Sequence, residues 1–530
     1  MIKTDITAKV GYTESDLKKA VCLSLPIAEN EIRSLRVLKR ALINIGTAAI
    51  SYKITLAISL SEDREAGLLK MKKKVSAAQQ YTLECIPSRL SCRPVVVGAG
   101  PAGLFAALFL AECGARPIVV ERGMSVEDRG KRIAEFNLLG LLDTECNVQF
   151  GEGGAGTYSD GKLKVGSMDK YKMKVLSEFV SAGADEDIIF TVGAHLGTDK
   201  LPAIVKNIRE KIISLGGEFL FSTRVTSLEI KNGELRSLKL ASGDKTDEIE
   251  TNIAVIATGH SAEDSFRMLE RAGLIMEPRG FGVGVRIEHP RAYIDGLVYG
   301  NHRPDGIGTA SYHLVTHLPS GRSAYSFCMC PGGSVVAATS TEGSVVTNGM
   351  SEHARMGDNS NAAILISVTP DDFGNSPLDG IRYQRSIEGA VFNIAGGEYK
   401  APAQRLSEFM ASERAHSLGG VTPSYPRGVE LVTPDEYLPD YITSSLRAAM
   451  LDFDKWMPGF NYGDAVITGA ETRSTSPIRV LRDGNFSAVG VRGIYPAGEG
   501  AGYAGGIVSS ATDGLRCAEA ILALAFESGV

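Results

Sequence analysis

The stretch Val95-Val96-Val97-Gly98-Ala99-Gly100-Pro101-Ala102-Gly103 decides the fold of this 530-residue chain. The three valines predict a short buried strand, and the uncharged run 104–111 predicts a compact helix after the turn. The glycines between them follow the pattern Gly-x-Gly-x-x-Gly. Gly98 permits the tight turn, Gly100 lets the backbone approach a pyrophosphate, and Gly103 lets helix and strand pack closely. The helix N-terminus supplies amides and the positive end of a dipole.

A second strand at 117–121 completes a βαβ unit. It ends in Glu121, 18 positions after Gly103, a spacing that suits a carboxylate accepting from ribose hydroxyls. This context, more than the glycine pattern alone, predicts a dinucleotide-binding domain. The segment 95–111 carries no charge over 17 residues, but its central glycines and proline favour strand, turn and helix over a membrane span.

The composition is that of a globular protein, with 44% hydrophobic and 22% charged residues. A net charge of -6 argues against a chain-wide surface for nucleic acid. Eight cysteines do not form a disulfide framework, and residues 1–5 contain no apolar signal segment. We therefore expect a cytoplasmic protein with neither a membrane nor a nucleic-acid partner.

Residues 1–90 are expected to form a separate α+β module. Apolar and polar residues alternate over 50–60, which predicts a strand with one buried face. Thr13 begins a helix-start pattern, whereas 32–45 fits either a helix or a strand. The segment 62–74 predicts a charged surface helix that ends in the basic run Lys70–Lys74.

Two further strands with Gly-rich ends, Ala254–Gly259 and Tyr495–Gly502, join the first motif. Together the three resemble the signature of FAD-binding oxidoreductases. The resemblance implies that the Gly98 loop holds the FAD pyrophosphate, that Glu121 holds the AMP ribose, and that the Glu499 turn lies by the ribityl chain and phosphate.

A fourth group of motifs narrows the family. The Gly-rich loop 147–163 is similar to one that lies against the flavin in one branch of this superfamily. Further matching segments are 308–309, 326–333, 348–351, 471–477 and 501–507. The set resembles the bacterial uncharacterised FAD-dependent dehydrogenases, also called NAD(P)/FAD-dependent oxidoreductases, over about residues 90–530. One departure is Ile43-Asn44-Ile45, where the family leads us to expect Asp-Ala-Arg.

This resemblance implies an α/β fold with a Rossmann-like FAD-binding domain of the hydroxybenzoate-hydroxylase-like branch. An α+β substrate domain is inserted into it, and a small α+β domain precedes it. We place the N-terminal module at 1–90, the FAD-binding domain at 91–269 and 471–530, and the substrate domain at 270–470. The sequence holds no second βαβ fingerprint, so any NAD(P)H would bind transiently, as a reductant, over the flavin.

The motifs and the resemblance assign FAD-binding roles to residues in six segments. They are Gly98, Gly100, Pro101, Ala102 and Gly103; Glu121 and Arg122; Gly154, Gly156, Thr157, Ser159 and Lys162; Val225; Ala257, Thr258 and Gly259; and Gly498, Glu499, Gly505, Gly506 and Ile507.

Three residues are candidates for catalysis: Cys330, Arg473 and His289. Cys330 forms a Cys-x-Cys pair with Cys328, either a redox thiol pair or two small residues buried on one face of a strand. Arg473 would bind a substrate carboxylate in bidentate fashion, or belong to a structural polar run.

His289 would act as an acid or base. The alternative interpretation of this segment is an ordinary ion pair between Arg286 and Glu288 on the surface. His260 follows the strand at 254–259, on the phosphate side, and we do not assign it catalysis. No second Cys pair occurs, so we predict no metal site.

We therefore expect an FAD-dependent oxidoreductase, a dehydrogenase acting on a small molecule. Two alternatives remain open. One is a flavin-containing RNA-modifying or RNA-binding protein that uses the basic run Lys70–Lys74. The other is a non-catalytic FAD-binding redox sensor that uses Cys328 and Cys330.

Overall fold

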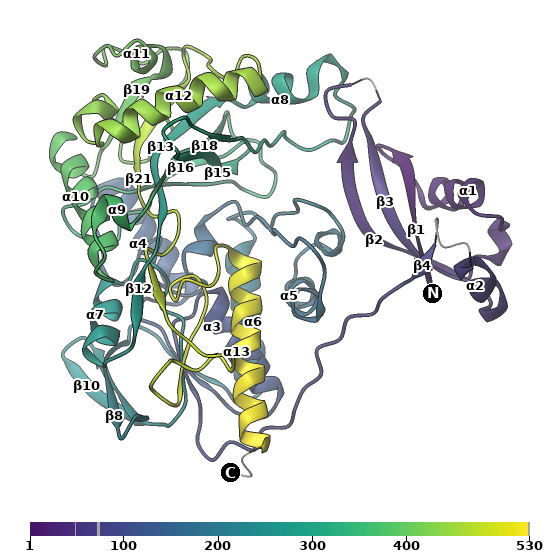
Figure 1. Cartoon of the computed structure of the whole chain (residues 1–530), viewed down its shortest axis with the longest axis horizontal. Helices are drawn as coiled ribbons and strands as arrows, with labels where there is room; N and C mark the ends of the chain where they lie inside the picture. The colour runs from purple at the N-terminus through teal and green to yellow at the C-terminus, as the bar shows by residue number, and fades with distance from the viewer. Residues whose placement is uncertain (48, 71–74, 528–530) are drawn as a thin grey trace.

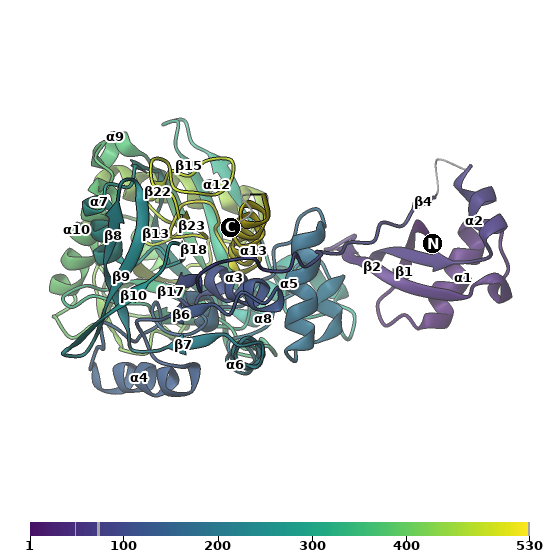
Figure 2. The ribbon, with the colours of Figure 1, turned by 90° about the horizontal axis from the view of Figure 1, so that it is seen from below.

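The computed structural model describes residues 1–47, 49–70 and 75–527 and shows a small N-terminal module beside a large body (Figures 1 and 2). The module is an antiparallel sheet in the order β2-β3-β1-β4, with helices α1 and α2 packed against it. The bounds are β1 Ile2–Lys9, β2 Ser34–Ile43, β3 Ser51–Ser59, β4 Ser76–Ala77, α1 Glu14–Ser24 and α2 Glu62–Leu69. The strand predicted over 50–60 is confirmed, and the ambiguous segment 32–45 is a strand.

A five-stranded parallel sheet forms the centre of the body, in the order β23-β11-β5-β6-β7. Its strands are β5 Val95–Val97, β6 Ile118–Val120, β7 Glu218–Leu220, β11 Ala254–Ile256 and β23 Ile494–Pro496. The predicted α/β class, with its βαβ unit, is confirmed. The carboxyl ends of all five strands meet at one edge, where open α/β sheets bind ligands.

Alternate side chains of β5 enter two different cores, as the period of a strand requires. Val96 packs with α3 (Pro101–Glu112) and α13 (Ile507–Glu527), which lie side by side. Val95 and Val97 pack on the other face, with the antiparallel sheet β8 (Arg224–Lys231), β9 (Glu234–Ser242) and β10 (Lys245–Glu250). The three valines are therefore fully buried, which explains their uninterrupted apolar run.

A seven-stranded sheet dominates the middle of the chain, in the order β14-β15-β18-β13-β21-β19-β20. Its strands are β13 Phe281–Pro290, β14 Val315–His317, β15 Ser323–Cys330, β18 Asn359–Val368, β19 Ala401–Arg405, β20 Val429–Leu431 and β21 Val466–Glu471. All its pairs are antiparallel except β19 with β20. In the described part of this region there is thus no second parallel βαβ unit.

The remaining elements connect or cover these sheets. The helices are α4 Val126–Leu139, α5 Lys170–Ser181, α6 Leu201–Ser214, α7 Glu263–Arg271, α8 Arg291–Tyr299, α9 Pro370–Phe373, α10 Asp379–Ile394, α11 Leu406–Met410 and α12 Asp440–Trp456; the strands are β12 Met276–Pro278, β16 Ser334–Ala337, β17 Thr347–Met350 and β22 Ile478–Val480. Among the described residues, no helix is long and apolar enough to cross a membrane. The domain bounds given above stay a prediction.

Arg40 attaches the N-terminal module to the body. Its backbone exchanges hydrogen bonds with Phe190 and Val192, and its guanidinium donates to Asp187 and Thr191 at 2.8 and 2.7 Å. Elsewhere an extended segment, residues 78–94, links the module to β5 (Figure 1). The module is therefore held at one side of the body by β2 and by apolar residues such as Ile50, which packs into the core of the middle region.

Arg129 of α4 is fully buried and holds the Gly-rich loop in place. Its guanidinium donates to five backbone carbonyls, those of Asn147, Val148, Gly151, Glu152 and Gly154, at 2.7–3.3 Å. One guanidinium thus meets five acceptors of one loop, and its Nη1 nitrogen is shared among three of them. The loop forms no regular strand. Hydrogen bonds from the Arg129 side chain therefore replace those that a neighbouring strand would supply.

We predict that Arg129→Met lowers the free energy of unfolding by at least about 3 kcal/mol, because it leaves several buried carbonyls without a donor. Guanidinium denaturation of the ligand-free protein measures this change. The matched control is Arg132→Met, which removes an exposed arginine from the same helix. Equal effects of the two substitutions would contradict the role of Arg129.

Candidate functional site

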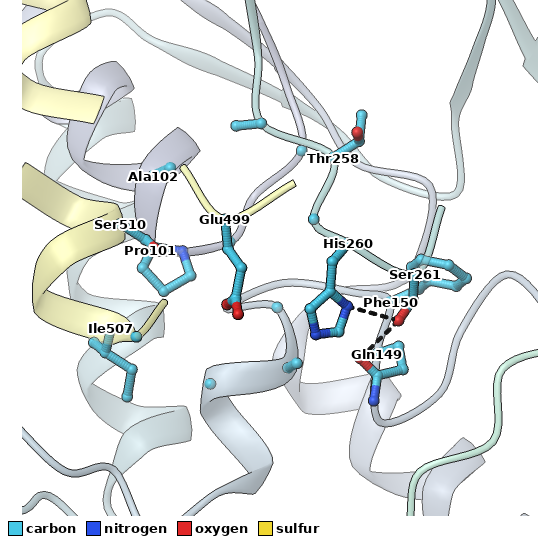
Figure 3. A pocket seen from close by; sticks show the side chains of 18 of the residues that line it. Pro101, Ala102, Gln149, Phe150, Thr258, His260, Ser261, Glu499, Ile507 and Ser510 are labelled. Atoms are coloured by element: carbon cyan, nitrogen blue, oxygen red, sulfur yellow. Dashed lines mark hydrogen bonds between the residues drawn. The ribbon is translucent and has the colours of Figure 1, made fainter. Parts of the chain in front are cut away.

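A cavity of about 420 Å³ opens where the central parallel strands end. This volume lies in the range of small-molecule and cofactor sites. Pro101, Ala102, Glu499 and Ile507 line one side, while His260 and the Gly-rich loop line the other (Figure 3). Side chains from the middle sheet complete the wall, so one continuous space joins the two large parts of the chain.

The three glycines of the first motif divide into two roles. A Cβ on Gly98 would lie 2.4 Å from the Ala257 carbonyl oxygen, and one on Gly103 would lie 1.8 Å from the Gly98 carbonyl oxygen. Both positions are therefore closed by backbone. A Cβ on Gly100 would meet nothing nearer than the Gly154 Cα at 3.8 Å. Gly100 keeps open space in the cavity wall, where a ligand can approach the backbone.

Two helices begin at the cavity. The first turn of α3 contributes Pro101 and Ala102, and the first turn of α13 contributes Ile507 and Val508. Amides of a first turn have no partner inside the helix, and they carry the positive end of the helix dipole. The two helices approach so closely that a Cβ on Gly514 would lie 2.0 Å from the Ala102 carbonyl oxygen. The arrangement favours an anionic ligand such as a pyrophosphate.

Glu121, at the end of β6, is buried and accepts three backbone hydrogen bonds. The donors are the amides of Ala99, Gly123 and Gly151, at 2.7, 2.9 and 3.0 Å. A carboxylate has about four acceptor sites, so one remains for a ligand hydroxyl. The three backbone amides thus fix the orientation of this carboxylate and leave one acceptor site toward the cavity.

Glu499 lines the cavity opposite His260 (Figure 3). Burial raises the pKa of Glu499 to about 7, against the attraction of Arg279. Near neutral pH part of the population is therefore protonated. A protonated carboxyl can donate to a hydroxyl or a phosphate oxygen, whereas a carboxylate would repel the phosphate.

These groups together fit FAD. Positive helix ends and open backbone at Gly100 suit the pyrophosphate, the free acceptor site of Glu121 suits a ribose hydroxyl, and the same cavity extends to Lys162 and Cys328. A mononucleotide would leave the Glu121 end without a partner.

Most residues assigned to the cofactor line this cavity: Gly98, Gly100, Pro101, Ala102, Glu121, Arg122, Gly154, Gly156, Ser159, Lys162, Val225, Ala257, Thr258, Gly259, Glu499, Gly505, Gly506 and Ile507. Gly103, Thr157 and Gly498 do not. Gly103 packs on Gly98, the Thr157 side chain faces Gly153, and Gly498 packs on Ala102 and donates its amide to Asp513. These three residues therefore stabilise the turn and the helices around the cavity.

Two catalytic candidates, His289 and Cys330, lie outside the cavity lining. His289 is fully buried on β13, its Nε2 is 2.8 Å from the Phe460 carbonyl oxygen, and burial lowers its pKa to about 4. This removes the geometric basis for an acid or base role. Cys330 is also fully buried, and its neighbour Cys328 lines the cavity instead.

Arg473 lines the cavity, but its guanidinium is already paired. It donates to both carboxylate oxygens of Glu388, at 2.8 and 2.7 Å, and to Ser340 at 2.7 Å. The attraction of Arg473 keeps the pKa of Glu388 at about 2, although burial opposes it. The fork expected to hold a substrate carboxylate is therefore occupied by the protein's own carboxylate.

The expectation of a surface pair between Arg286 and Glu288 is wrong. Both side chains are fully buried, and Arg286 donates to Glu471 at 2.6 and 3.0 Å. Glu288 instead accepts from Ser424 and Asn359. β13 lies between β18 and β21, so its polar residues are buried with partners from other strands.

Several lining residues carried no catalytic or cofactor assignment: Gln149, Phe150, Lys164, His260, Phe327, Asn348, Glu471 and Ser474. His260 lies 3.0 Å from the Ser261 hydroxyl, which donates to Gln149 at 3.1 Å. Burial lowers the pKa of His260 to about 4, so its ring is neutral at physiological pH.

Of the basic run Lys70–Lys74 proposed for RNA binding, residues 71–74 lie outside the described residues.

Comparisons with known proteins agree with this geometry. Residues 280–474 match the family model "FAD-dependent protein, C-terminal domain-like", and residues 91–134 match "FAD binding domain". A protein of Clostridium beijerinckii, described as "Uncharacterized protein", is 42% identical over 514 residues, which cover 96% of this chain and 95% of that protein.

Solved structures resemble the chain more distantly. A flavin-dependent brominase is 11% identical, with 82% of this chain and 80% of that chain covered and a TM-score of 0.38. An L-proline dehydrogenase from P. horikoshii is 14% identical, with 82% and 94% covered and a TM-score of 0.35. Scores this low support no inference about reaction or substrate.

We predict that Glu499→Gln stabilises the ligand-free protein more at pH 8 than at pH 5. The unfolded chain loses this proton near pH 4.5, whereas the folded protein keeps it up to about pH 7. As the pH rises from about 4.5 to 7, the unfolded chain gives up this proton before the folded protein does. The contribution of Glu499 to the free energy of unfolding therefore falls by about 1–3 kcal/mol over this range.

Guanidinium denaturation at pH 5, 6, 7 and 8 tests this prediction, with exposed Glu436→Gln as the control. A difference between Glu499→Gln and the original protein that stays constant with pH would contradict it.

Proposed function

This chain belongs to a family of FAD-dependent proteins, and from that premise we propose that it is an FAD-dependent oxidoreductase, a dehydrogenase of a small molecule. One observation carries the proposal. A single cavity joins dinucleotide-binding groups at the ends of the parallel strands to side chains of the middle sheet, namely Phe327, Cys328 and Glu471. A cofactor bound at the first would meet a substrate at the second.

The residues that would hold FAD follow from their chemistry. The first turn of α3 and the open backbone at Gly100 would bind the pyrophosphate, Glu121 one ribose hydroxyl, and Glu499 the ribityl region. The positive end of α13, beside Gly505 and Gly506, would stabilise negative charge on a bound ring. FAD itself supplies hydride or electron transfer.

The rest of the cavity would receive the substrate and exclude water. Phe327 and Ile507 are apolar, while Asn348 and Lys164 are polar groups that can orient a small molecule. The Lys162 ammonium donates to the Met329 carbonyl and lies 3.9 Å from Asp160, so its position is fixed. We also propose that NAD(P)H, if it is the reductant, binds transiently in this same space.

Eight cysteines without a disulfide support a cytoplasmic location.

Anaerobic reduction of the bound flavin tests this function. NADH, NADPH and a panel of metabolites are added in turn, and flavin absorbance is followed. Bleaching by at least one donor, with turnover when an acceptor is supplied, is the expected result. A flavin that dithionite reduces but no metabolite reduces would overturn the dehydrogenase and favour the non-catalytic sensor.

We predict that Gly100→Val abolishes FAD retention without unfolding the protein. The new side chain fills the space for the pyrophosphate, and its Cβ meets no protein atom nearer than the Gly154 Cα at 3.8 Å, so we expect a cost of only about 1 kcal/mol at the helix N-cap. FAD affinity should fall by at least about 100-fold, equal to about 2.7 kcal/mol.

Released flavin, measured after acid treatment and chromatography, and the melting temperature report the two effects separately. Gly67→Val in α2, where a Cβ meets nothing within 4 Å, is the matched control. Normal FAD content in Gly100→Val would place the pyrophosphate elsewhere.

A further inference from the structure

A bulge in β15 brings two cysteine sulfurs together. The pairing with β18 advances three residues, from Phe327 to Cys330, against two on the partner strand. Cys328 has a φ of 38°, in the left-handed region that few non-glycine residues adopt. Two residues of a regular strand advance about 6.6 Å. The sulfurs of Cys328 and Cys330 are only 3.9 Å apart.

The two thiols differ in access. Cys328 is half-buried and lines the cavity, near enough to Glu499 for their charges to interact. Cys330 is fully buried behind it, and its thiol donates to the Cys328 carbonyl oxygen at 3.2 Å. Cys328 therefore borders the space for a ligand, whereas Cys330 lies buried next to it.

The surroundings favour a thiolate at Cys328. The neighbouring Cys330 thiol and, to a smaller extent, the positive charges of Arg286 and Lys162 together lower the pKa of Cys328 to about 5, against the effect of burial. Buried Cys517, by contrast, has its pKa raised by burial. Arg286 also donates to the Cys328 carbonyl at 3.0 Å, so the same side chain fixes the bulge and supplies charge. A thiolate is the reactive form of cysteine.

We propose that Cys328 and Cys330 form a dithiol–disulfide pair that exchanges two electrons with FAD bound in the cavity. This inference rests on the proposed FAD site, and it adds a second redox centre to it. Two small core residues would also fill the space, but core packing requires neither the bulge nor a cysteine in the cavity lining.

The exchange balances with FAD as the partner. When the pair is oxidised, the Cys328 thiolate and the Cys330 thiol form one S–S bond, and Cys330 releases its proton. The two electrons lost by the sulfurs, with that proton, convert oxidised FAD to its anionic reduced form. In reverse, reduced FAD gives up two electrons and a proton, and the S–S bond is cleaved to a thiolate and a thiol.

The first test uses protein freed of FAD, so that it does not depend on the flavin. After oxidation with diamide, thiols are alkylated, and peptides are mapped by mass spectrometry. We expect a Cys328–Cys330 disulfide, lighter by two hydrogens and protected from alkylation, which dithiothreitol reverses. Cys85 and Cys113 also interact, so Cys85→Ser is the control that removes this other close pair. Alkylation of both Cys328 and Cys330 after diamide would overturn the proposal.

The second test is an anaerobic dithionite titration of the oxidised holoprotein. The original protein and Cys85→Ser should take up twice as many electrons per flavin as Cys328→Ser and Cys330→Ser. Melting temperatures identify any variant that fails to fold, and the remaining serine variant then decides the result. Equal uptake in all four proteins would overturn the exchange with FAD.

The two tests keep this inference apart from the proposed function. If the protein binds no FAD, the proposed function fails and the exchange falls with it, whatever the thiols do. If FAD binds and metabolites reduce it, but no disulfide forms, the pair alone is rejected and the dehydrogenase stands.

Discussion

The guanidinium of Arg129 is the contact on which the cavity depends. Its five hydrogen bonds hold a loop that has no strand neighbour, and Gly151 of that loop also donates to Glu121. Glu152, in the same loop, accepts from the amide of Val126 and from Arg209. The loop therefore closes over the ends of the parallel strands and leaves one cavity between the central sheet and the middle sheet.

Charge within this cavity is arranged by burial and by helix ends. Two helices direct positive ends into it, and the carboxyl of Glu499 is held partly neutral by burial. Arg286 pairs with Glu471, and Arg473 pairs with Glu388, so the protein's own carboxylates engage both guanidinium groups. In the proposed mode of binding, an anionic dinucleotide would meet donors at its phosphates, and Lys162, Asn348 and Cys328 would lie near its other end.

Local patterns were sufficient to predict the centre of the fold. The valines of β5, the glycines after them and Glu121 belong to one short motif with fixed spacing, and they lie where the motif places them. Long-range partners could not be predicted. Nothing near Arg473 indicates that Glu388, 85 residues earlier, occupies its fork. His289 lies on a central strand buried on both faces, so its polar character marks core structure. The bulge at Cys328 breaks the alternation on which strand prediction relies.

A crystal structure of the protein with FAD tests the central claim most directly. We expect density for FAD in this cavity, with its pyrophosphate at the first turn of α3, its AMP ribose beside Glu121, and its ring between the start of α13 and Cys328. Density for FAD at another place, or an FAD ring remote from Cys328 and α13, would contradict the account.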